Sequence, residues 1–572
     1  MLRRRLTTAF CLAFILFTII IISIRSSSTP TVRVPTVADL SEGAKQVAGA
    51  VTNPKLPKLY NPFSQSAHQP PEQADSSNGA TKWYSDLSWL NPFSSETTLD
   101  NERALLPPLP PRQTIYTFYE PSQDSDVVAA EHALLLTWRR AWWAKGFKPI
   151  VLGRAEAAKH PLHNRVQKLN LNDKLEKEAV RWLAWAHMGG GILMNWLALP
   201  MTELDDPVLL FLKRGKFDPL LKFKGLANSV LCGEVRKIEI ALEEFVNVSA
   251  SAEVRTFLDA LSLDSVQIVD PESAIAFYDE ETITFSYDKI HDELAESQAA
   301  GLQKLQQLIN AHLHTTWQRG FPDGIAVLKP HPDKTTAIIA PALRLARDLT
   351  ACPDSPMPSS CPPNDPKCKP CSGSKSDLKM TTPSTFRNSS TTFTIGTVPH
   401  PYTFTTIQHN LEFLDALFIR RRTKRDQWIN ATTSEMLGDK LNGAQRLVPF
   451  KDAVASPFAI AHSLWMTAER AEAFQRDWLL GFELRNAGGN LPPAGVSASQ
   501  VAKERSLLEL ALETLADSKN RPIVNTVQAW NLADAEAWNF VRAFQVRRRT
   551  EREKWEAQES KFAGAEDKRS AG

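Results

Sequence analysis

The chain has 572 residues, of which 43% are apolar, so it can bury a sizeable core and exceeds the length of one simple domain. Its 66 Lys and Arg residues nearly balance 64 Asp and Glu residues, and a net charge of +2 gives no indication of a nucleic-acid-binding surface. The sequence has no Gly-Lys-Ser/Thr phosphate loop, no G-x-S-x-G elbow and no H-E-x-x-H motif. These absences argue against the common ATPases, α/β-hydrolases and zincins.

An uncharged apolar segment, residues 6–24, is long enough to cross a bilayer as a helix. Arg3–Arg5 precede it and only Arg25 follows closely, so the positive-inside rule places the N-terminus in the cytoplasm and the rest in a lumen. We therefore expect residues 1–25 to be a cytoplasmic tail and signal-anchor of a single-pass type II protein in the Golgi or endoplasmic reticulum membrane. A cleaved signal peptide and a mitochondrial inner-membrane anchor are the alternatives.

Three further regions follow the anchor. Residues 26–112 are rich in Pro, Ser, Thr and Asn, and we predict a disordered stem because such a segment buries too little apolar surface to fold. Residues 113–500 form the predicted lumenal α/β domain, with a Cys-rich insertion over 351–390. Residues 501–572 are predicted to be C-terminal helices and a charged tail.

Apolar periodicity and turn residues predict, in chain order, a strand over 114–119, a helix over 127–145, a strand over 147–152, a helix over 174–187 that stops at three glycines, and a strand over 192–196. The first three elements make a βαβ unit, which implies a parallel sheet. Further strands are expected at 230–232, 337–340 and 392–395, and further helices at 301–317, 457–484, 506–516 and 534–559. We expect the last helix to extend into solvent, and Trp138, Trp142 and Trp182 to lie in the core.

Four cysteines lie close together among Pro, Ser and Lys residues: Cys352, Cys361, Cys368 and Cys371. No local core can form there, so we expect two disulfides whose pairing the sequence does not reveal. A zinc site is the alternative, although only Cys368 and Cys371 have ligand-like spacing. Three N-glycosylation sequons, at Asn247, Asn388 and Asn430, agree with a lumenal location.

The most informative stretch holds Arg181-Trp182, His187, Gly189–Gly191 and Asn195-Trp196-Leu197. It resembles the sugar-binding region of the DXD-containing glycosyltransferases, to which the fungal outer-chain mannosyltransferases belong. In that family a helix with an Arg and an aromatic residue leads to a Gly-Gly turn, and a short strand delivers two carboxylates to a divalent metal that holds a nucleotide sugar. The chain also resembles fungal type II membrane proteins.

This resemblance covers about residues 113–215 and implies a GT-A-like, Rossmann-type mixed sheet flanked by helices. It also implies a set of substrate-binding residues: Arg181, His187, Gly190, Gly191 and Asn195. The glycines permit a tight turn and leave the backbone bare for a sugar nucleotide. His400 is a further candidate, because it lies in a loop after a predicted strand.

The chain departs from the family where Asn195-Trp196-Leu197 stands in place of Asp-x-Asp. Hard divalent cations prefer carboxylate oxygens, so the sequence assigns no metal ligand and leaves the use of Mn²⁺ with a nucleotide sugar in doubt. The cations of 420–425 could hold a diphosphate instead, or Glu203, Asp205 and Asp206 could supply ligands, although we expect these acids to cap a helix. The fold could also have been kept and catalysis lost.

Two functions follow from this comparison. The first is a membrane-anchored glycosyltransferase-like protein that transfers a sugar from a nucleotide sugar to a glycan or glycoprotein acceptor. The second is a non-catalytic lumenal glycan-binding or scaffold protein on the same fold. An unrelated membrane-tethered protein is the third hypothesis, since fold analogy alone does not establish function.

Overall fold

The computed structural model describes residues 67–71, 106–107, 109–249, 254–262, 265–270, 274–329, 336–371, 376–403, 426–438, 443–467, 473–484 and 498–562. The predicted anchor, most of the predicted stem and the basic run at 420–425 lie outside these ranges. Within them, no helix combines the length and apolar character that a bilayer span requires. The chain divides into two compact units, 1–61 and 62–572, and every element described below belongs to the second.

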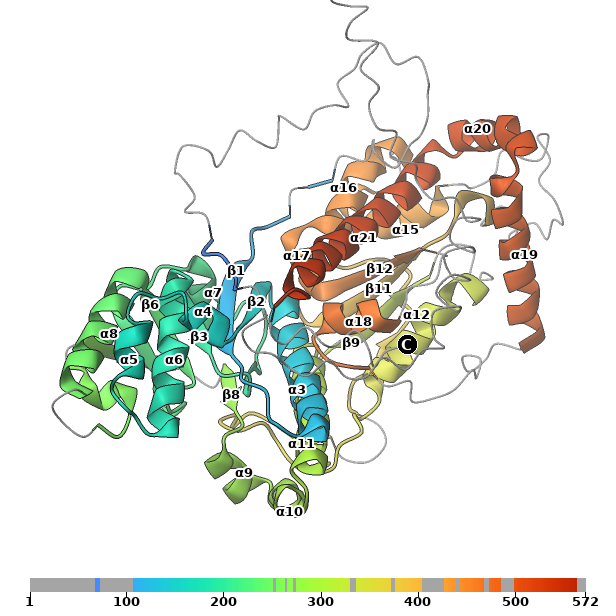
Figure 1. Ribbon diagram of the computed structural model, residues 1–572. Helices are drawn as coiled ribbons and strands as arrows, with labels where there is room; N and C mark the ends of the chain where they lie inside the picture. Colours follow the sequence, from blue (N-terminus) through green and yellow to red (C-terminus); the bar gives the residue numbers. More distant parts are fainter. Residues whose placement is uncertain are drawn as a thin grey trace, which may run out of the picture. The chain divides into compact units, whose positions relative to one another are not determined.

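The fold is mixed α/β, with two main sheets flanked by helices (Figure 1). The first sheet has six strands in the order β2-β1-β3-β6-β5-β7. Their bounds are β1 (Gln113–Phe118), β2 (Phe147–Leu152), β3 (Gly190–Met194), β5 (Leu220–Phe223), β6 (Val230–Glu234) and β7 (Val266–Val269). β1, β2 and β3 are mutually parallel, whereas β6 runs antiparallel between β3 and β5. The sheet is therefore mixed, as the resemblance implied, and parallel only over β2, β1 and β3 and between β5 and β7.

The predicted βαβ unit is confirmed. β1 pairs with β2 in parallel from Gln113↔Phe147 to Phe118↔Leu152. The crossover helix α3 (Ser125–Ala144) begins where the side chain of Asp124 accepts the N–H groups of Asp126 and Val127. Three of its buried residues, Trp138, Trp142 and Trp143, face the core. The helix stops before Gly146, whose φ of 88° turns the chain back into β2.

One face of the first sheet is covered by the helices that follow β2 and β6. They are α4 (Arg154–Ala157), α5 (His163–Gln167), α6 (Asp173–His187) and α8 (Val235–Ser249). Trp182 of α6 stacks on Phe257 at a ring distance of 4.2 Å and meets Trp185 edge-on at 5.3 Å. In Figure 1 the teal helices α5 and α6 and the green helix α8 lie beside β3 and β6. This face therefore has its own aromatic core.

The opposite face packs on α3, and α11 (Gln298–Arg319) packs on α3 in turn. A short antiparallel pair, β4 (Ala198–Pro200) with β8 (Ile275–Phe277), continues this core. The remaining elements of the region are α7 (Pro207–Arg214), the 3-10 helix Phe257–Ala260, α9 (Glu280–Ser286) and α10 (Asp288–Glu296). Asp206 caps α7, where its Oδ1 accepts the Val208 N–H at 2.8 Å, so the predicted capping role of an acid before Pro207 is confirmed.

The second sheet is parallel, in the order β10-β9-β11-β12. Its strands are β9 (Gly324–Leu328), β10 (Met380–Thr381), β11 (Thr392–Val398) and β12 (Ser463–Thr467). The helices of this part of the chain are α12 (Thr336–Thr350), α15 (Gln427–Leu437), α16 (Gly443–Ala455), α17 (Pro457–His462), α18 (Ala473–Leu480), α19 (Ala498–Ala516), the 3-10 helix Ser518–Asn520, α20 (Arg521–Trp530) and α21 (Leu532–Glu559). An aromatic core that includes Trp428, Phe450 and Trp465 joins β12 to α15, α16 and α21.

Two predicted elements are wrong in this half, and a third, the helix predicted over 534–559, is confirmed but lies in different surroundings from those expected. The strand expected at 337–340 belongs to helix α12, and the helix expected over 457–484 is broken by strand β12. Both errors concern short apolar runs, whose periodicity does not separate a buried strand from a buried helix. The helix expected to extend into solvent, α21, instead buries Trp538, Phe540 and Val541.

The Cys-rich segment connects α12 to β11, at the predicted place, and contains β10. It holds two nested disulfides, Cys352–Cys371 and Cys361–Cys368. The expectation of two disulfides is confirmed, and the zinc alternative is wrong because all four sulfurs are paired. Among the described residues, Cys232 is the free thiol, and it is buried in β6.

Candidate functional site

The glycine turn lies at the amino end of β3. The space beside the Gly190 backbone is occupied by other parts of the protein. Gly190 and Gly191 have φ angles of 81° and 100°, which agrees with the predicted tight turn. A Cβ atom on Gly190 would lie 2.6 Å from the carbonyl oxygen of Gly233. His187, at the end of α6, places its Nε2 3.2 Å from the carbonyl oxygen of His68. The close approach at Gly190 is thus made by β6 rather than left open for a ligand.

Arg181 lies toward the other end of β3, where it braces the loop before β6. Its guanidinium donates to the carbonyl oxygens of Asn228 at 2.9 Å and Ser229 at 3.4 Å. Burial lowers the pKa of Arg181 to about 10, against the opposing effect of Glu178. The Glu178 carboxylate in turn accepts hydrogen bonds from the Asn228 amide and from the backbone N–H of Phe257. Arg181 therefore has a structural role in this arrangement.

Asn195 follows β3 and closes a turn. Its backbone N–H donates to Ser229 O at 2.7 Å, and its side-chain Oδ1 accepts the Leu197 N–H at 2.9 Å. Residues 195–197 are half-buried at the end of the strand and not deep in the interior.

The residues of this turn do not fit a divalent metal. The amide oxygen of Asn195 is already engaged, and neither Trp196 nor Leu197 offers a hard ligand. Across the described ranges, His, Cys, Asp and Glu side chains nowhere gather in a group of three or more that could hold a metal ion. We derive no reaction step through a metal at this position.

An aromatic and acidic cluster lies beside this turn, and we call it the carboxyl-edge cluster: Tyr119, Glu131, His132 and Trp196. Tyr119 directly follows β1, and its ring meets Trp196 edge-on at 6.3 Å and His132 at 5.6 Å. The Tyr119 hydroxyl donates to Glu131 Oε2 at 2.9 Å. Tyr119 is buried, whereas the other three side chains are half-buried and so reach the surface.

An ion-pair network extends the edge to the end of β2. Arg154 pairs with Glu120 through Nε and with Glu176 through a 3.0 Å contact. The hydrogen bonds that Arg154 donates to Glu120 and Glu176 raise its pKa, with burial opposing them. Tyr119 and Glu120 follow β1, Arg154 follows β2 and Trp196 follows β3. These side chains converge because the carboxyl ends of three parallel strands meet at one edge, which is where α/β sheets commonly bind ligands.

The arrangement has the chemistry of a polyol-binding surface. The half-buried Trp196 ring offers an apolar face, and the half-buried carboxylate of Glu131 is a hydrogen-bond acceptor for hydroxyl groups. Sequence reasoning found Asn195 but missed Tyr119, Glu131, His132 and Arg154. A signal was present for part of this edge, because Tyr119 ends the first predicted strand and Arg154 lies two residues after the second. Glu131 and His132 lie within the predicted helix, where no such signal marks them.

His400 is not part of this edge. It follows β11 of the second sheet, is buried, and meets Trp538 of α21 edge-on at 4.6 Å. Burial lowers the pKa of His400 to about 3, with the nearby Arg542 acting in the same direction. Its Nδ1 accepts the Tyr402 N–H at 3.2 Å. The structure thus places His400 in a packed environment, separate from the other candidate residues.

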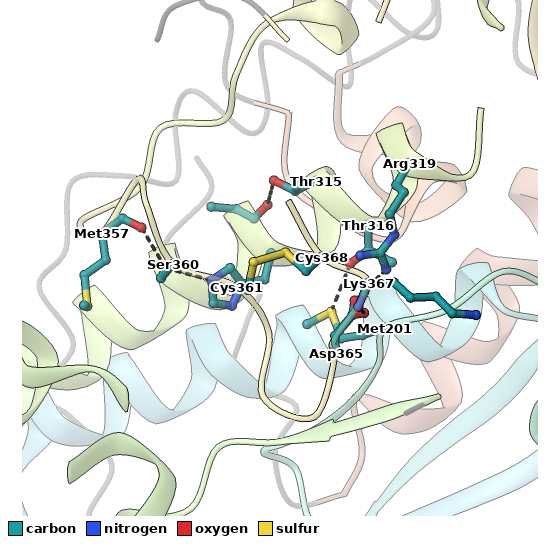
Figure 2. Close-up of a disulfide and its surroundings, with 12 residues drawn as sticks. Met201, Thr315, Thr316, Arg319, Met357, Ser360, Cys361, Asp365, Lys367 and Cys368 are labelled. Atoms are coloured by element: carbon teal, nitrogen blue, oxygen red, sulfur yellow. Dashed lines mark hydrogen bonds and ion pairs between the residues drawn. A yellow bond between two sulfur atoms is a disulfide. The ribbon is translucent and has the colours of Figure 1, made fainter. Parts of the chain in front are cut away.

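A surface pocket of about 600 Å³ lies at the Cys361–Cys368 disulfide, where Tyr287, Ser360 and Asp365 contribute to its lining. In Figure 2 the guanidinium of Arg319 points to Asp365, with which it forms a 2.6 Å ion pair. The loop is thereby fixed to the end of α11.

Ser360 also belongs to a buried hydrogen-bond chain. Its Oγ lies 3.0 Å from Nε2 of His312, whose Nδ1 lies 2.8 Å from the Tyr278 hydroxyl. Burial lowers the pKa of His312 to about 3, and the Ser360 hydroxyl donates to the carbonyl oxygen of Met357 at 2.7 Å, as Figure 2 shows. A histidine of such low basicity is a poor general base, so this chain anchors the disulfide loop rather than activating the serine.

The three sequons differ in exposure. The side chains of Asn247, near the end of α8, and Asn388, in the loop before β11, are exposed. Asn430 lies within α15, and its amide oxygen is buried. Only the first two are therefore sterically open to a glycan in the folded chain.

The fold and the edge together define the class of protein: a two-sheet α/β protein whose first sheet gathers polar and aromatic side chains at the carboxyl ends of its parallel strands. A family profile described as a domain of unknown function (DUF8765) matches residues 77–572. The chain belongs to this family. No match was found among curated proteins or among solved structures.

Proposed function

We propose that this chain is a membrane-anchored, lumenal sugar-binding protein that uses the carboxyl-edge cluster to hold a glycan without metal-assisted transfer. The observation that carries the proposal is the half-buried Trp196, set edge-on to Tyr119 beside Glu131 and His132. An aromatic ring next to a few fixed polar groups is the usual make-up of a specific small-ligand site. The apolar face of a sugar ring fits the indole, and its hydroxyl groups fit the carboxylate of Glu131.

The polar partners of the cluster are held in place before any ligand arrives. Glu131 Oε2 is fixed by the Tyr119 hydroxyl at 2.9 Å and by the Ser122 N–H at 3.3 Å. Asn195 fixes the turn that carries Trp196, through its 2.9 Å bond to Leu197. Preorganised groups lose little conformational entropy on binding, which favours recognition of a weakly hydrophobic ligand such as a glycan.

A glycosyltransferase on a GT-A-like fold is the second candidate. The parallel strands β2-β1-β3, followed by the antiparallel β6, support it, because the resemblance implies a mixed sheet of this kind. The turn at residues 195–197 sits at the carboxyl end of β3, where the family delivers its carboxylates. The replacement of both carboxylates favours binding over transfer, since Asn195 is committed to Leu197.

A Golgi or endoplasmic reticulum location belongs to the same proposal. Two disulfides support an oxidising compartment, and the exposed sequons at Asn247 and Asn388 are compatible with N-glycosylation there. The lipid bilayer is the proposed partner of residues 6–24, and a glycan is the proposed ligand of the carboxyl-edge cluster. A nucleotide sugar and a glycan acceptor are the partners only in the transferase alternative.

The test is a thermal-shift screen of the full chain in detergent micelles against oligosaccharides and nucleotide sugars, each with and without Mn²⁺. A ligand that binds only the folded state raises the melting temperature by mass action. We expect an oligosaccharide to stabilise the wild type equally with and without Mn²⁺. In Trp196→Ala this stabilisation should disappear, because the stacking surface is removed.

Trp530→Ala is the matched control, because Trp530 is also an accessible tryptophan, 50% exposed on α20. It should keep the full ligand response. Stabilisation only by a nucleotide sugar with Mn²⁺ would support the transferase instead. A response that survives Trp196→Ala, or no response to any saccharide, contradicts the proposed sugar site.

A further inference from the structure

A short segment of the region expected to be stem, residues 67–71, is seated in the folded domain. His68 is only 5% exposed. Both its backbone N–H and its ring Nδ1 lie 2.8 Å from Glu156 Oε1. Glu156 belongs to α4 and is itself buried. The segment therefore makes a two-point contact with a carboxylate 88 residues further along the chain.

The other side of the His68 ring faces the end of the chain. Its Nε2 lies 3.3 Å from both carboxylate oxygens of Glu559, in the last turn of α21. The ring stacks on Phe562 at 3.5 Å with an interplanar angle of 24°. A histidine near the N-terminal part of the unit thus joins α4 to the C-terminal end of α21.

Groups from two more elements face this contact. His187 of α6 places its Nε2 3.2 Å from the carbonyl oxygen of His68. Burial, together with the charge of Glu559, raises the pKa of Tyr116 in β1, which keeps that phenol neutral. Glu156 also accepts the Gly153 N–H at 2.7 Å, so it is held in position with or without the histidine.

The charge state follows from these neighbours. Burial by itself lowers the pKa of His68, but hydrogen bonds and charge from Glu156 and Glu559 outweigh it and raise the pKa to about 9. For Glu156, burial alone acts to raise the pKa, while hydrogen bonds from His68 and Gly153 lower it. The contact is therefore a buried imidazolium between two carboxylates, and a buried charge of this kind depends on its partners.

We propose that residues 67–71 are a pH-dependent clasp: His68 seats between the carboxylates of Glu156 and Glu559 and fastens this part of the predicted stem to the two-sheet domain. This device is independent of the carboxyl-edge cluster, so it holds whether or not a glycan binds there. It ties α4, which begins at the end of β2, to the last turn of α21.

The sign of the pH dependence follows from linkage. The pKa of His68 is about 9 when docked and 6.5 when undocked, so docking is strongest below pH 6.5 and weakens as the pH rises toward 9. This interval corresponds to a loss on the order of 100-fold in the docking equilibrium. The pKa of Glu156 is lowered, so its contribution is present above about pH 4.5 and is lost as the pH falls through the lowered value. The clasp is thus tightest in mildly acidic solution.

Hydrogen–deuterium exchange of the full chain in detergent micelles tests this, read on a peptic peptide that contains residues 67–71. After correction for intrinsic exchange, protection in the wild type should fall on the order of 100-fold between pH 6 and pH 9.5. His68→Gln should remove the protection at both pH values. Glu559→Gln should move its loss to lower pH, because one of the two carboxylates that raise the His68 pKa is gone.

Glu553→Gln is the matched control, since Glu553 is an exposed residue of the same helix and pairs only loosely with Arg549, at 3.8 Å. It should leave the profile unchanged, and protection of a peptide from β1 should report in every variant that the domain is folded. Protection that stays constant from pH 6 to pH 10 in the wild type overturns the clasp. Equal protection in wild type and His68→Gln overturns it as well.

Discussion

The two ends of β3 differ in what surrounds them. At the amino end, the backbone of Gly190 is pressed against Gly233 and Val235, so that a Cβ atom would lie 2.6 and 2.9 Å from their backbone atoms. At the carboxyl end, Trp196 is half-buried and its neighbours are polar and aromatic side chains. Gly190, in the glycine run that attracts attention in the sequence, is needed for close backbone packing. The surface proposed to bind a ligand lies at the other end of the same strand.

The difference shows how a glycine motif has to be judged. Glycine is needed wherever two backbones approach closely or φ is positive, and a ligand is only one of the groups that can approach. Here the approaching group is β6 with the start of α8. The following predictions test this contrast between the two ends, from the largest expected effect to the smallest.

Gly190→Ala should destabilise the fold by about 3 kcal/mol or more, because it combines a φ of 81° with overlap on fixed backbone atoms. Gly189→Ala is the matched control. Its φ of 85° is equally unfavourable for alanine, but no other atoms lie within 4 Å of the new Cβ. It should lower the unfolding free energy by only about 1 kcal/mol.

Chemical denaturation of both variants measures the difference. If both substitutions lowered the unfolding free energy by the same amount, the amino end of β3 would not be closely packed. The two ends of β3 would then not differ in the way described above. If Gly190→Ala had normal stability but no longer bound the saccharide, the glycine turn would be part of the ligand-binding site.

Arg181→Ala should destabilise the chain by about 2–3 kcal/mol, because it removes two hydrogen bonds to the loop before β6 and leaves the charge of Glu178 without its cation. Arg181→Lys should recover part of this loss, since it keeps the charge but not the paired geometry. Denaturation gives the stability, and calorimetric titration gives the affinity for the stabilising saccharide. Unchanged stability with abolished affinity would make Arg181 a ligand-binding residue, as the resemblance implied.

Asn195→Ala should lower the unfolding free energy by about 1 kcal/mol, because the Leu197 N–H loses its acceptor. Asn195→Asp keeps an acceptor at the same atom and should be within about 0.5 kcal/mol of the wild type. Thermal unfolding with and without Mn²⁺ shows whether this position only closes a turn or can also bind a metal. Strong stabilisation of Asn195→Asp by Mn²⁺ would show that the turn can hold a metal after all.

Much of the first sheet could be predicted because its signals are local. The aromatic and β-branched residues of Thr114–Tyr119, the helical spacing of the tryptophans in α3 and the glycine at position 146 each act within a few residues, and β1, α3 and β2 follow from them. Strand β12 could not be predicted in the same way. Its Trp465 is a strand residue because it packs across Gly396, where a Cβ would lie 2.2 Å from the indole, and that contact is set by the tertiary fold.

The candidate site also has one part that local sequence signals indicated and another that depends on tertiary contacts. Asn195 was found because it stands at the place of a known motif, and the carboxyl edge itself was implied by the parallel βαβ unit. The pairing of Tyr119 with Glu131 and Trp196 depends on side chains from three elements, and no local pattern encodes it. The docking of His68 was missed for a similar reason, since its partner Glu559 is 491 residues away.

The central claim is that a saccharide binds at the carboxyl edge of the first sheet. Photo-crosslinking with a diazirine-bearing form of the stabilising oligosaccharide, followed by peptide mapping, locates the ligand directly. We predict crosslinks on the peptides that contain Tyr119, Glu131 and Trp196. Crosslinks confined to the pocket at Ser360 and Cys361, or to the glycine turn at the amino end of β3, would contradict the account.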